Sequence, residues 1–104
     1  MHRELISTTE IDGFEINFYA MPEDTDPSGE FDDGGFTARQ IAEGTIEWFV
    51  ACVTASKAGV ELGADYLGGC AYESAADFVE ELYFEDMAAA AINEAREKLA
   101  ELAA

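Results

Sequence analysis

The segment Asp24–Gly35, DTDPSGEFDDGG, carries the side chains best suited to hold a metal ion. Its oxygen-bearing residues follow the calcium loop of an EF-hand at positions 1, 3, 5 and 9, with glycine at position 6: Asp24, Asp26, Ser28, Asp32 and Gly29. Position 12 is Gly35, where that loop needs a bidentate Glu. Pro22 and Pro27 also interrupt the segment, and the residues before it alternate like a strand. We therefore expect a solvated acidic loop with no specific metal site and no cofactor.

Side chains for covalent or acid–base catalysis are scarce. His2 is the single histidine, so a Ser-His-Asp or Cys-His arrangement would depend on a residue at the frayed terminus. Carboxylates are abundant, but no pattern marks one pair as buried with a raised pKa. The glycines of GADYLGG are not followed by Lys-Ser/Thr, as a phosphate-binding loop requires. The sequence predicts no catalytic residues and a protein that is not an enzyme.

The cysteines and the hydropathy pattern bear on location. Cys52 and Cys70 have no CxxC or other metal-ligand spacing, which favours reduced core residues in a cytosolic protein. No transmembrane run and no signal-peptide pattern is found in the sequence. We expect a cytoplasmic protein, which would be the host cytoplasm if a phage encodes the chain.

The net charge is the most unusual property of the chain. Its 104 residues suit one domain, 1–104, and a hydrophobic fraction of 49% is enough to form a core. Five basic residues face 23 acidic ones, which gives a net charge of −18. Such a surface repels both nucleic acid and anionic membranes. We expect neither as a direct partner.

Two hairpins are predicted. In ELISTTEIDGFEINFYAM, the pair Asp12-Gly13 favours a two-residue type I′ turn. The register then pairs, on a common core face, Ile11 with Phe14, Thr9 with Ile16, Ser7 with Phe18 and Leu5 with Ala20. The second hairpin spans 47–72, with a three-residue turn at Lys57-Ala58-Gly59 and a bulge or turn at Gly68-Gly69. One face of it should hold Trp48, Val50, Cys52, Thr54, Leu62, Ala64 and Tyr66.

Helices are expected between and after the hairpins. Thr37 and Gln40 form a capping-box pattern, and Gly44 can end a short helix there. Ser74 can cap a further helix with Asp77 in its first turn. A longer helix follows over 84–102, with an apolar stripe at Phe84, Met87 or Ala88, Ala91, Ala95, Leu99 and Leu102. The predicted fold is α+β: two antiparallel hairpins in a small sheet, a short connecting helix, and C-terminal helices packed on one face.

The distribution of the charge points to a function. Between Lys57 and Arg96 the chain has nine acidic residues and no basic one. Ordinary acidic helices place Lys four residues from Glu, so this chain accepts self-repulsion that a binding role would offset. A domain of this length has a radius of gyration of about 13 Å and a diameter of roughly 34 Å. Duplex DNA of that length carries about 20 charges, close to the net −18.

In size, acidity and α+β pattern the whole chain resembles the small acidic DNA-mimic inhibitors of phages and mobile elements, of the anti-CRISPR or anti-restriction type. No diagnostic motif carries this resemblance. It implies a stoichiometric inhibitor that blocks a basic DNA- or RNA-binding surface on a CRISPR surveillance complex, nuclease or restriction enzyme. Two alternatives stay open: an acidic adaptor or antitoxin-like binding module, and a halophilic housekeeping protein.

The predicted partner-binding residues are acids of the base-free span and of the acidic loop. Those of the span are Asp65, Glu73, Asp77, Glu80, Glu81, Glu85 and Asp86, and those of the loop are Asp32 and Asp33. Helical spacing would place 77, 80, 81 and 85 on one exposed side. Their carboxylates would meet Arg and Lys side chains that otherwise hold phosphates.

Overall fold

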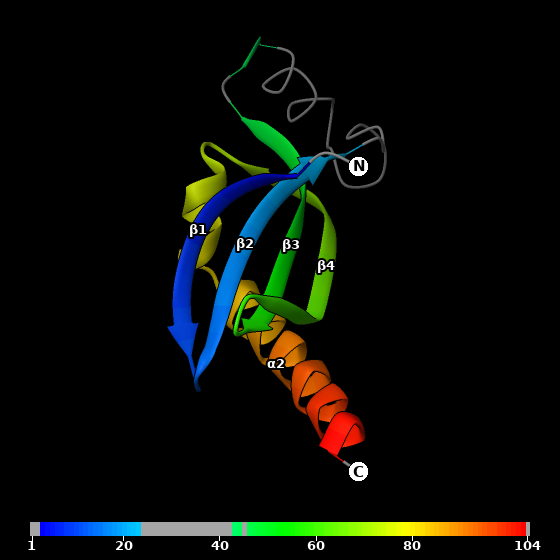
Figure 1. The fold of residues 1–104 in the computed structure, drawn as a ribbon. Helices are drawn as coiled ribbons and strands as arrows, with labels where there is room; N and C mark the ends of the chain where they lie inside the picture. The colour runs from blue at the N-terminus through cyan, green and yellow to red at the C-terminus, as the bar shows by residue number, and fades with distance from the viewer. Residues whose placement is uncertain (1–2, 24–42, 45, 104) are drawn as a thin grey trace.

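The computed structural model describes residues 3–23, 43–44 and 46–103. Its elements are the strands β1 (Glu4–Ile11), β2 (Phe14–Pro22), β3 (Glu47–Lys57) and β4 (Val60–Tyr72), the 3₁₀ helix η2 (Ala75–Glu80) and the helix α2 (Leu82–Ala103). The strands form one antiparallel sheet in the order β1-β2-β3-β4. Helix α2 crosses one face of the sheet and extends past its end (Figure 1). The α+β fold expected from the sequence is confirmed.

Both hairpins close through two-residue turns. Asp12 and Gly13 have φ of 54° and 81°, as the predicted type I′ turn requires. In the second hairpin Ala58 and Gly59 also have positive φ, 52° and 79°, and Lys57 pairs directly with Val60. The expected three-residue turn at Lys57 is therefore wrong. The type I′ geometry matches the twist of the strands, and Ala58 adopts the left-handed conformation to achieve it.

The register of the first hairpin agrees with the sequence except at its open end. Ile11–Phe14, Thr9–Ile16 and Ser7–Phe18 are paired as predicted. The pair Leu5–Ala20 is wrong, because a bulge between Leu5 and Ser7 moves Leu5 opposite Tyr19. One extra residue turns the side chains on the N-terminal side of the bulge to the other face. Leu5 is consequently 54% exposed, and Ile6 packs against the core instead.

Strand β3 is buried on both faces. Ala51 and Val53 belong to the core under α2, and Cys52 and Thr54 on the opposite face are also fully buried. Ala64 lies opposite Thr54 and Tyr66 opposite Cys52, so these four residues share a face as predicted. Leu62 does not share that face. A second irregularity pairs Ala55 with Gly63 and Ser56 with Glu61, which leaves Leu62 between them and in the core. The bulge expected at Gly68-Gly69 is present, with Gly69 at φ 67°.

An aromatic cluster joins the sheet to the helical layer. The Phe18 ring stacks on Phe78 of η2, with ring centroids 5.1 Å apart. It is tilted against Phe49 and meets Phe84 edge to face, with centroids 6.2 and 6.3 Å away. From Ala88 to Ala95 the buried face of α2 is mostly alanine, which lets the helix approach β4 closely. The predicted stripe holds as far as Leu99. Leu102 is 77% exposed, because α2 has by then passed the end of the sheet.

The helical region is divided in two. The Ser74 side chain accepts the Ala76 N–H and caps η2, with Asp77 in its first turn as predicted. At Glu81 the backbone is extended, with φ −89° and ψ 152°, and α2 begins at the next residue. Most of the expected short helix at 37–44 lies outside the described residues. Gly44 itself has φ 80°, which suits a helix C-terminus.

Candidate functional site

The acidic segment of the helical layer consists of six exposed carboxylates. They are Glu73, Asp77, Glu80, Glu81, Glu85 and Asp86. Within the described part of the chain none of the six forms an ion pair with a basic side chain. They belong to η2, to the start of α2 and to the residues beside these helices. This surface is consequently open to a cationic partner.

Residues 77, 80, 81 and 85 do not lie on one side of a single helix, as was predicted from their spacing. Asp77 and Glu80 belong to η2, whereas Glu85 belongs to α2, and the extended backbone at Glu81 separates the two helices. Helical periodicity therefore does not relate these side chains. They remain close in sequence and exposed, on two helices that the extended residue Glu81 separates.

The other predicted contact residues lie elsewhere. Asp65 is half-buried on β4 opposite Val53, a core residue, so it lies on the face of the sheet that α2 covers. It is therefore less accessible than the acidic segment. Asp32, Asp33 and the loop with the calcium-like spacing lie outside the described residues. Among the residues that are described, no group of three or more His, Cys, Asp or Glu side chains could hold a metal ion.

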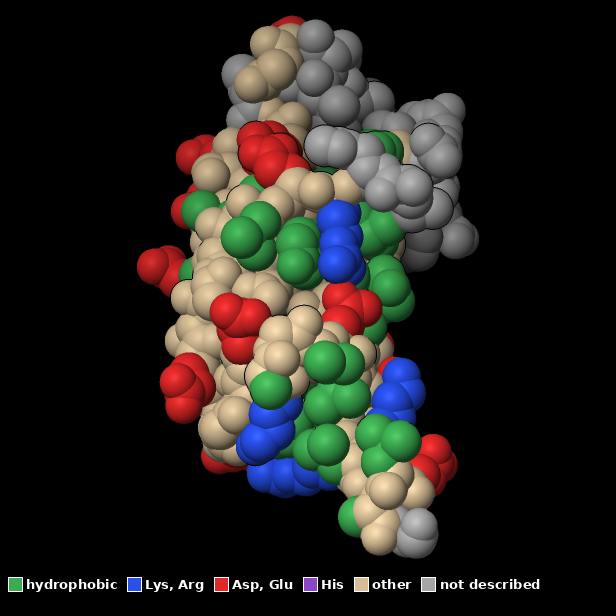
Figure 2. Space-filling model, in the orientation of Figure 1, with side chains coloured by type: hydrophobic (Ala, Val, Ile, Leu, Met, Phe, Trp, Pro, Cys, Tyr) green, Lys and Arg blue, Asp and Glu red, His purple; other side chains and the backbone are tan. Residues whose placement is uncertain are grey.

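Three basic side chains gather around the β1–β2 turn and the C-terminal half of α2. Arg96 on α2 pairs with Asp12 in the β1–β2 turn at 3.5 Å, and Lys98 pairs with Glu94 at 3.3 Å. The Lys57 ammonium lies 4.8 Å from the centre of the Phe14 ring, near the same turn. Lys and Arg side chains accordingly cluster at the lower end in Figure 2. Of the acidic segment, Glu85 lies near these bases, because Glu85 and Arg96 line one groove between the β1–β2 turn and α2.

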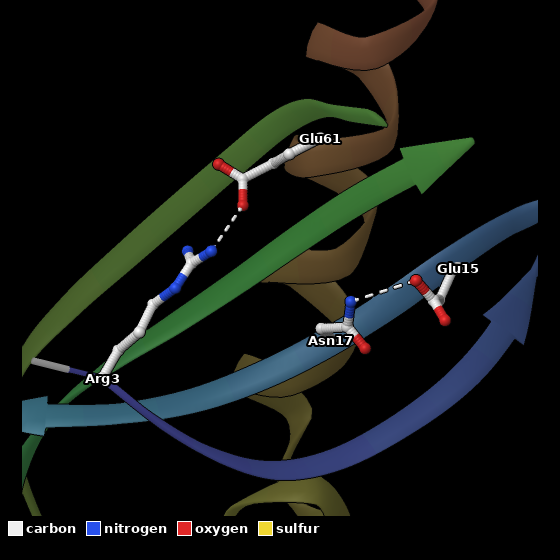
Figure 3. Close-up of polar contacts among 4 residues, drawn as sticks. All are labelled: Arg3, Glu15, Asn17 and Glu61. Carbon is white, nitrogen blue, oxygen red and sulfur yellow. Dashed lines mark hydrogen bonds and ion pairs between the residues drawn. The ribbon is translucent and has the colours of Figure 1, made fainter. Parts of the chain in front are cut away.

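The face of the sheet that α2 leaves open carries one basic side chain among the described residues, and that side chain has a structural role. The Arg3 guanidinium lies 4.0 Å above the Tyr19 ring and 3.1 Å from the Glu61 carboxylate. Beside it, Thr8 donates to Asn17 at 2.7 Å, and the Asn17 amide donates to Glu15 at 3.3 Å. Figure 3 shows the Arg3–Glu61 contact reaching across the strands to β4 and the Asn17–Glu15 contact running along β2. This network covers β3 and explains why Cys52 is buried.

The two thiols lack the properties of nucleophiles. Burial raises the pKa of Cys52, an effect that hydrogen bonding from Tyr66 and the charge of Arg3 oppose. Burial likewise raises the pKa of Cys70, whose thiol donates to the Leu67 carbonyl at 3.3 Å. A reactive cysteine needs a lowered pKa and access to solvent. Both residues fit the core role expected from the sequence.

Two acids that the sequence did not single out stabilise the fold. The Glu47 carboxylate accepts the Ala75 N–H at 2.6 Å, and Glu23 accepts the Gly69 N–H at 2.7 Å. Each contact joins residues far apart in the chain, and neither carboxylate forms part of a recognisable motif. Part of the acidity is therefore structural, which distinguishes these two residues from the acidic segment.

A groove at the edge of the acidic segment was also not predicted from the sequence. It lies between the β1–β2 turn and α2, encloses about 340 Å³, and is lined by Ile11, Asp12, Glu85, Ala88, Ile92 and Arg96, among others. Because the turn ends at Gly13 and the helix begins at Leu82, only the packing of these distant segments brings the side chains together. The type I′ turn that fixes Asp12 and the helix over 84–102 were both predicted from the sequence, but the contact between them was not.

No protein-family model, curated protein or solved structure matches this chain. None of the described helices is long and apolar enough to cross a membrane.

Proposed function

We propose that this protein is a stoichiometric inhibitor that mimics the charge of DNA and occupies a nucleic-acid-binding surface of a defence complex or nuclease. The observation that carries the proposal is the acidic segment: six exposed carboxylates within fourteen residues, with no basic partner in the described part of the chain. Carboxylates so presented form charge-assisted hydrogen bonds with Arg and Lys side chains, as phosphates do.

The dimensions of the molecule narrow the proposal. Its longest axis is 53 Å and its radius of gyration is 15.5 Å. The diameter of roughly 34 Å expected for a spherical domain of this chain length is therefore wrong. Duplex DNA as long as the longest axis of the protein carries roughly 31 charges, well above the net charge of 18. The average charge density therefore falls short of that of DNA. Mimicry would have to rest on the acidic segment, where the carboxylates are concentrated, and not on the molecule as a whole.

The proposed partner is a basic DNA- or RNA-binding protein surface in the cytoplasm, such as that of a CRISPR surveillance complex, a nuclease or a restriction enzyme. An acidic adaptor could use the same carboxylates without imitating DNA. The two roles differ in one respect, because a mimic and a duplex cannot occupy the partner together. Competition with DNA therefore separates them.

The test begins with capture of the partner from host lysate on the immobilised protein. A triple charge reversal, Glu80→Lys, Glu81→Lys and Glu85→Lys, should weaken binding at least tenfold and abolish competition with duplex DNA. A matched reversal at exposed positions outside the segment, Glu10→Lys, Glu97→Lys and Glu101→Lys, makes the same change in net charge and should have a much smaller effect. Equal effects of the two sets, or simultaneous binding of DNA and protein to the partner, would contradict the proposal.

A further inference from the structure

The groove between the β1–β2 turn and α2 combines an apolar floor with a charged rim. Ala88 and Ile92 of α2 are 2% and 3% exposed and form part of its lining, and Ile11 at the end of β1 is half-buried beside them. Asp12 and Glu85 are both exposed and contribute one carboxylate each, from the turn and from the helix. Glu85 is also a member of the acidic segment, so the groove continues that surface.

One guanidinium already lies in this groove. The Arg96 Nη2 atom is 3.5 Å from the Asp12 Oδ2 atom, and the two side chains are 56% and 61% exposed. An exposed ion pair of this kind contributes little stability, because water and salt screen it. Arg96 therefore shows that a guanidinium reaches the Asp12 carboxylate, and it can be displaced at little cost. No ion pair of Glu85 is found among the described residues.

The shape and chemistry of the groove favour a single side chain as its occupant. A volume of about 340 Å³ is at the low end of the range for small-ligand sites. It is too small to take a helix or a strand of a partner. A guanidinium is planar, weakly hydrated and able to lie on apolar surface while it pairs with a carboxylate. The aliphatic stem of an arginine would cover Ile11 and Ile92, since long basic side chains bury their stems on such surfaces.

We propose that the groove between Asp12 and Glu85 receives an arginine side chain of the inhibited partner, which displaces Arg96 from Asp12. This inference rests on the proposed function, because it gives the acidic segment one defined pocket for a basic residue of the target. It also assigns a role to Arg96, which competes with the incoming arginine and lowers the affinity of the groove.

The experiment uses the full chain and a small ligand, so that it does not depend on the partner. Nα-acetyl-arginine amide is titrated while the methyl resonances of the isoleucines are followed by NMR. We expect saturable shifts of the Ile11 and Ile92 methyls, with Ile6 and Ile16 as internal controls outside the groove. The citrulline analogue, which has the same shape without the charge, should bind at least tenfold more weakly. Asp12→Asn should weaken binding of the arginine amide at least threefold.

The substitution Arg96→Ala separates a pocket from a general charge effect. It should tighten binding of the arginine amide at least threefold, whereas Lys98→Ala, which removes the same charge from the neighbouring Glu94 pair, should change it by less than half as much. Equal effects of the two variants, equal binding of citrulline, or no movement of the Ile11 and Ile92 methyls would each overturn the inference. These binding results can contradict the groove while the triple reversal at Glu80, Glu81 and Glu85 still abolishes competition with DNA. In that case the arginine-binding role of the groove is wrong and the proposed function stands.

Discussion

Gly63 of β4 lies directly against the backbone of Ala91 in α2. A β-carbon at Gly63 would overlap the Ala91 carbonyl oxygen and would lie 2.9 Å from the Ala95 nitrogen. Both alanines are fully buried, so neither neighbour is a flexible side chain that could move aside. The close approach of helix and sheet therefore depends on the absence of a side chain at this one position.

Gly63→Ala should accordingly destabilise the protein by about 1–3 kcal/mol, the usual range for overpacking a core. Urea denaturation followed by circular dichroism measures the change. Gly68→Ala is the matched control, because its β-carbon would meet no more than the end of the Glu23 side chain, at 3.0 Å. A Gly63 variant as stable as the Gly68 variant would contradict the packing described here.

Thr54 should be replaceable with a gain in stability. It is fully buried on β3, and within the described residues its hydroxyl is the buried side-chain oxygen that has no hydrogen-bond partner. A buried polar group without a partner costs about 1–3 kcal/mol. Thr54→Val keeps the shape and removes the hydroxyl, so it should raise the free energy of unfolding by about 1 kcal/mol. Thermal and urea denaturation of the variant measure this.

Thr8→Val should have the opposite effect, because the Thr8 hydroxyl has a hydrogen-bond partner. The Thr8 hydroxyl donates to the Asn17 side chain at 2.7 Å, and Asn17 is 9% exposed. Removing that donor should lower stability by about 0.5–1.5 kcal/mol. If Thr54→Val loses as much stability as Thr8→Val, the Thr54 hydroxyl forms a hydrogen bond in the folded protein and the prediction is wrong.

Stability should fall as the pH rises above that at which an exposed thiol ionises, about 8.5. Burial raises the pKa of both Cys52 and Cys70 in the folded state. Above pH 8.5 the unfolded chain loses thiol protons that the folded chain keeps, so ionisation favours unfolding. Each thiol can contribute a slope of up to about 1.4 kcal/mol per pH unit. Below pH 8 both states hold the protons, and this effect is absent.

Urea denaturation at pH 7 to 9.5 tests this, because free tyrosine ionises only near pH 10. The double variant Cys52→Ala and Cys70→Ala serves as the comparison. Its stability at pH 7 can differ from that of the parent, but its decline between pH 8 and 9.5 should be much shallower. An unchanged decline would show that other groups cause the pH dependence.

Sequence patterns predicted the strands and most of the pairs of the first hairpin, and they failed at the second turn and where one residue is inserted into a strand. Asp12-Gly13 and the alternation around it predicted three of four pairs in the first hairpin, and the bulge near Leu5 displaced the fourth. Leu62 was assigned to the wrong face for the same reason. A period of two residues contains no signal for a bulge, and a single insertion reverses every later side chain.

The site was predictable in composition but not in geometry. The base-free run identified the exposed acids, because charge is counted without knowing the backbone. Their arrangement depends on the extended backbone at Glu81, which the capping pattern at Ser74 did not reveal. The groove depends on Asp12 meeting Arg96, a contact between elements distant in sequence. Long-range contacts of this kind follow from packing and leave no local pattern.

The acidic segment should reduce stability, if its carboxylates serve binding and not folding. Like charges crowded on a surface repel one another and destabilise the folded state, and the energy of an exposed charge pair is at most about 1 kcal/mol. Replacing Glu80, Glu81 and Glu85 together by Gln removes three charges at nearly constant shape. The free energy of unfolding should rise by up to about 1 kcal/mol at low salt, and the difference from the parent should shrink as sodium chloride screens the remaining charges. Thermal denaturation from 10 mM to 1 M salt measures both effects.

Glu47→Gln is the control, because the same chemical change should here lower the free energy of unfolding and not raise it. The Glu47 carboxylate accepts the Ala75 N–H at 2.6 Å, so its neutralisation removes a charge-assisted hydrogen bond and should lower stability. A surface carboxylate retained for binding and one retained for folding should thus respond in opposite directions to the same chemical change. If the triple Gln variant also loses stability, the acids of the segment contribute to the fold, and the inference that self-repulsion is tolerated for the sake of a cationic partner is wrong.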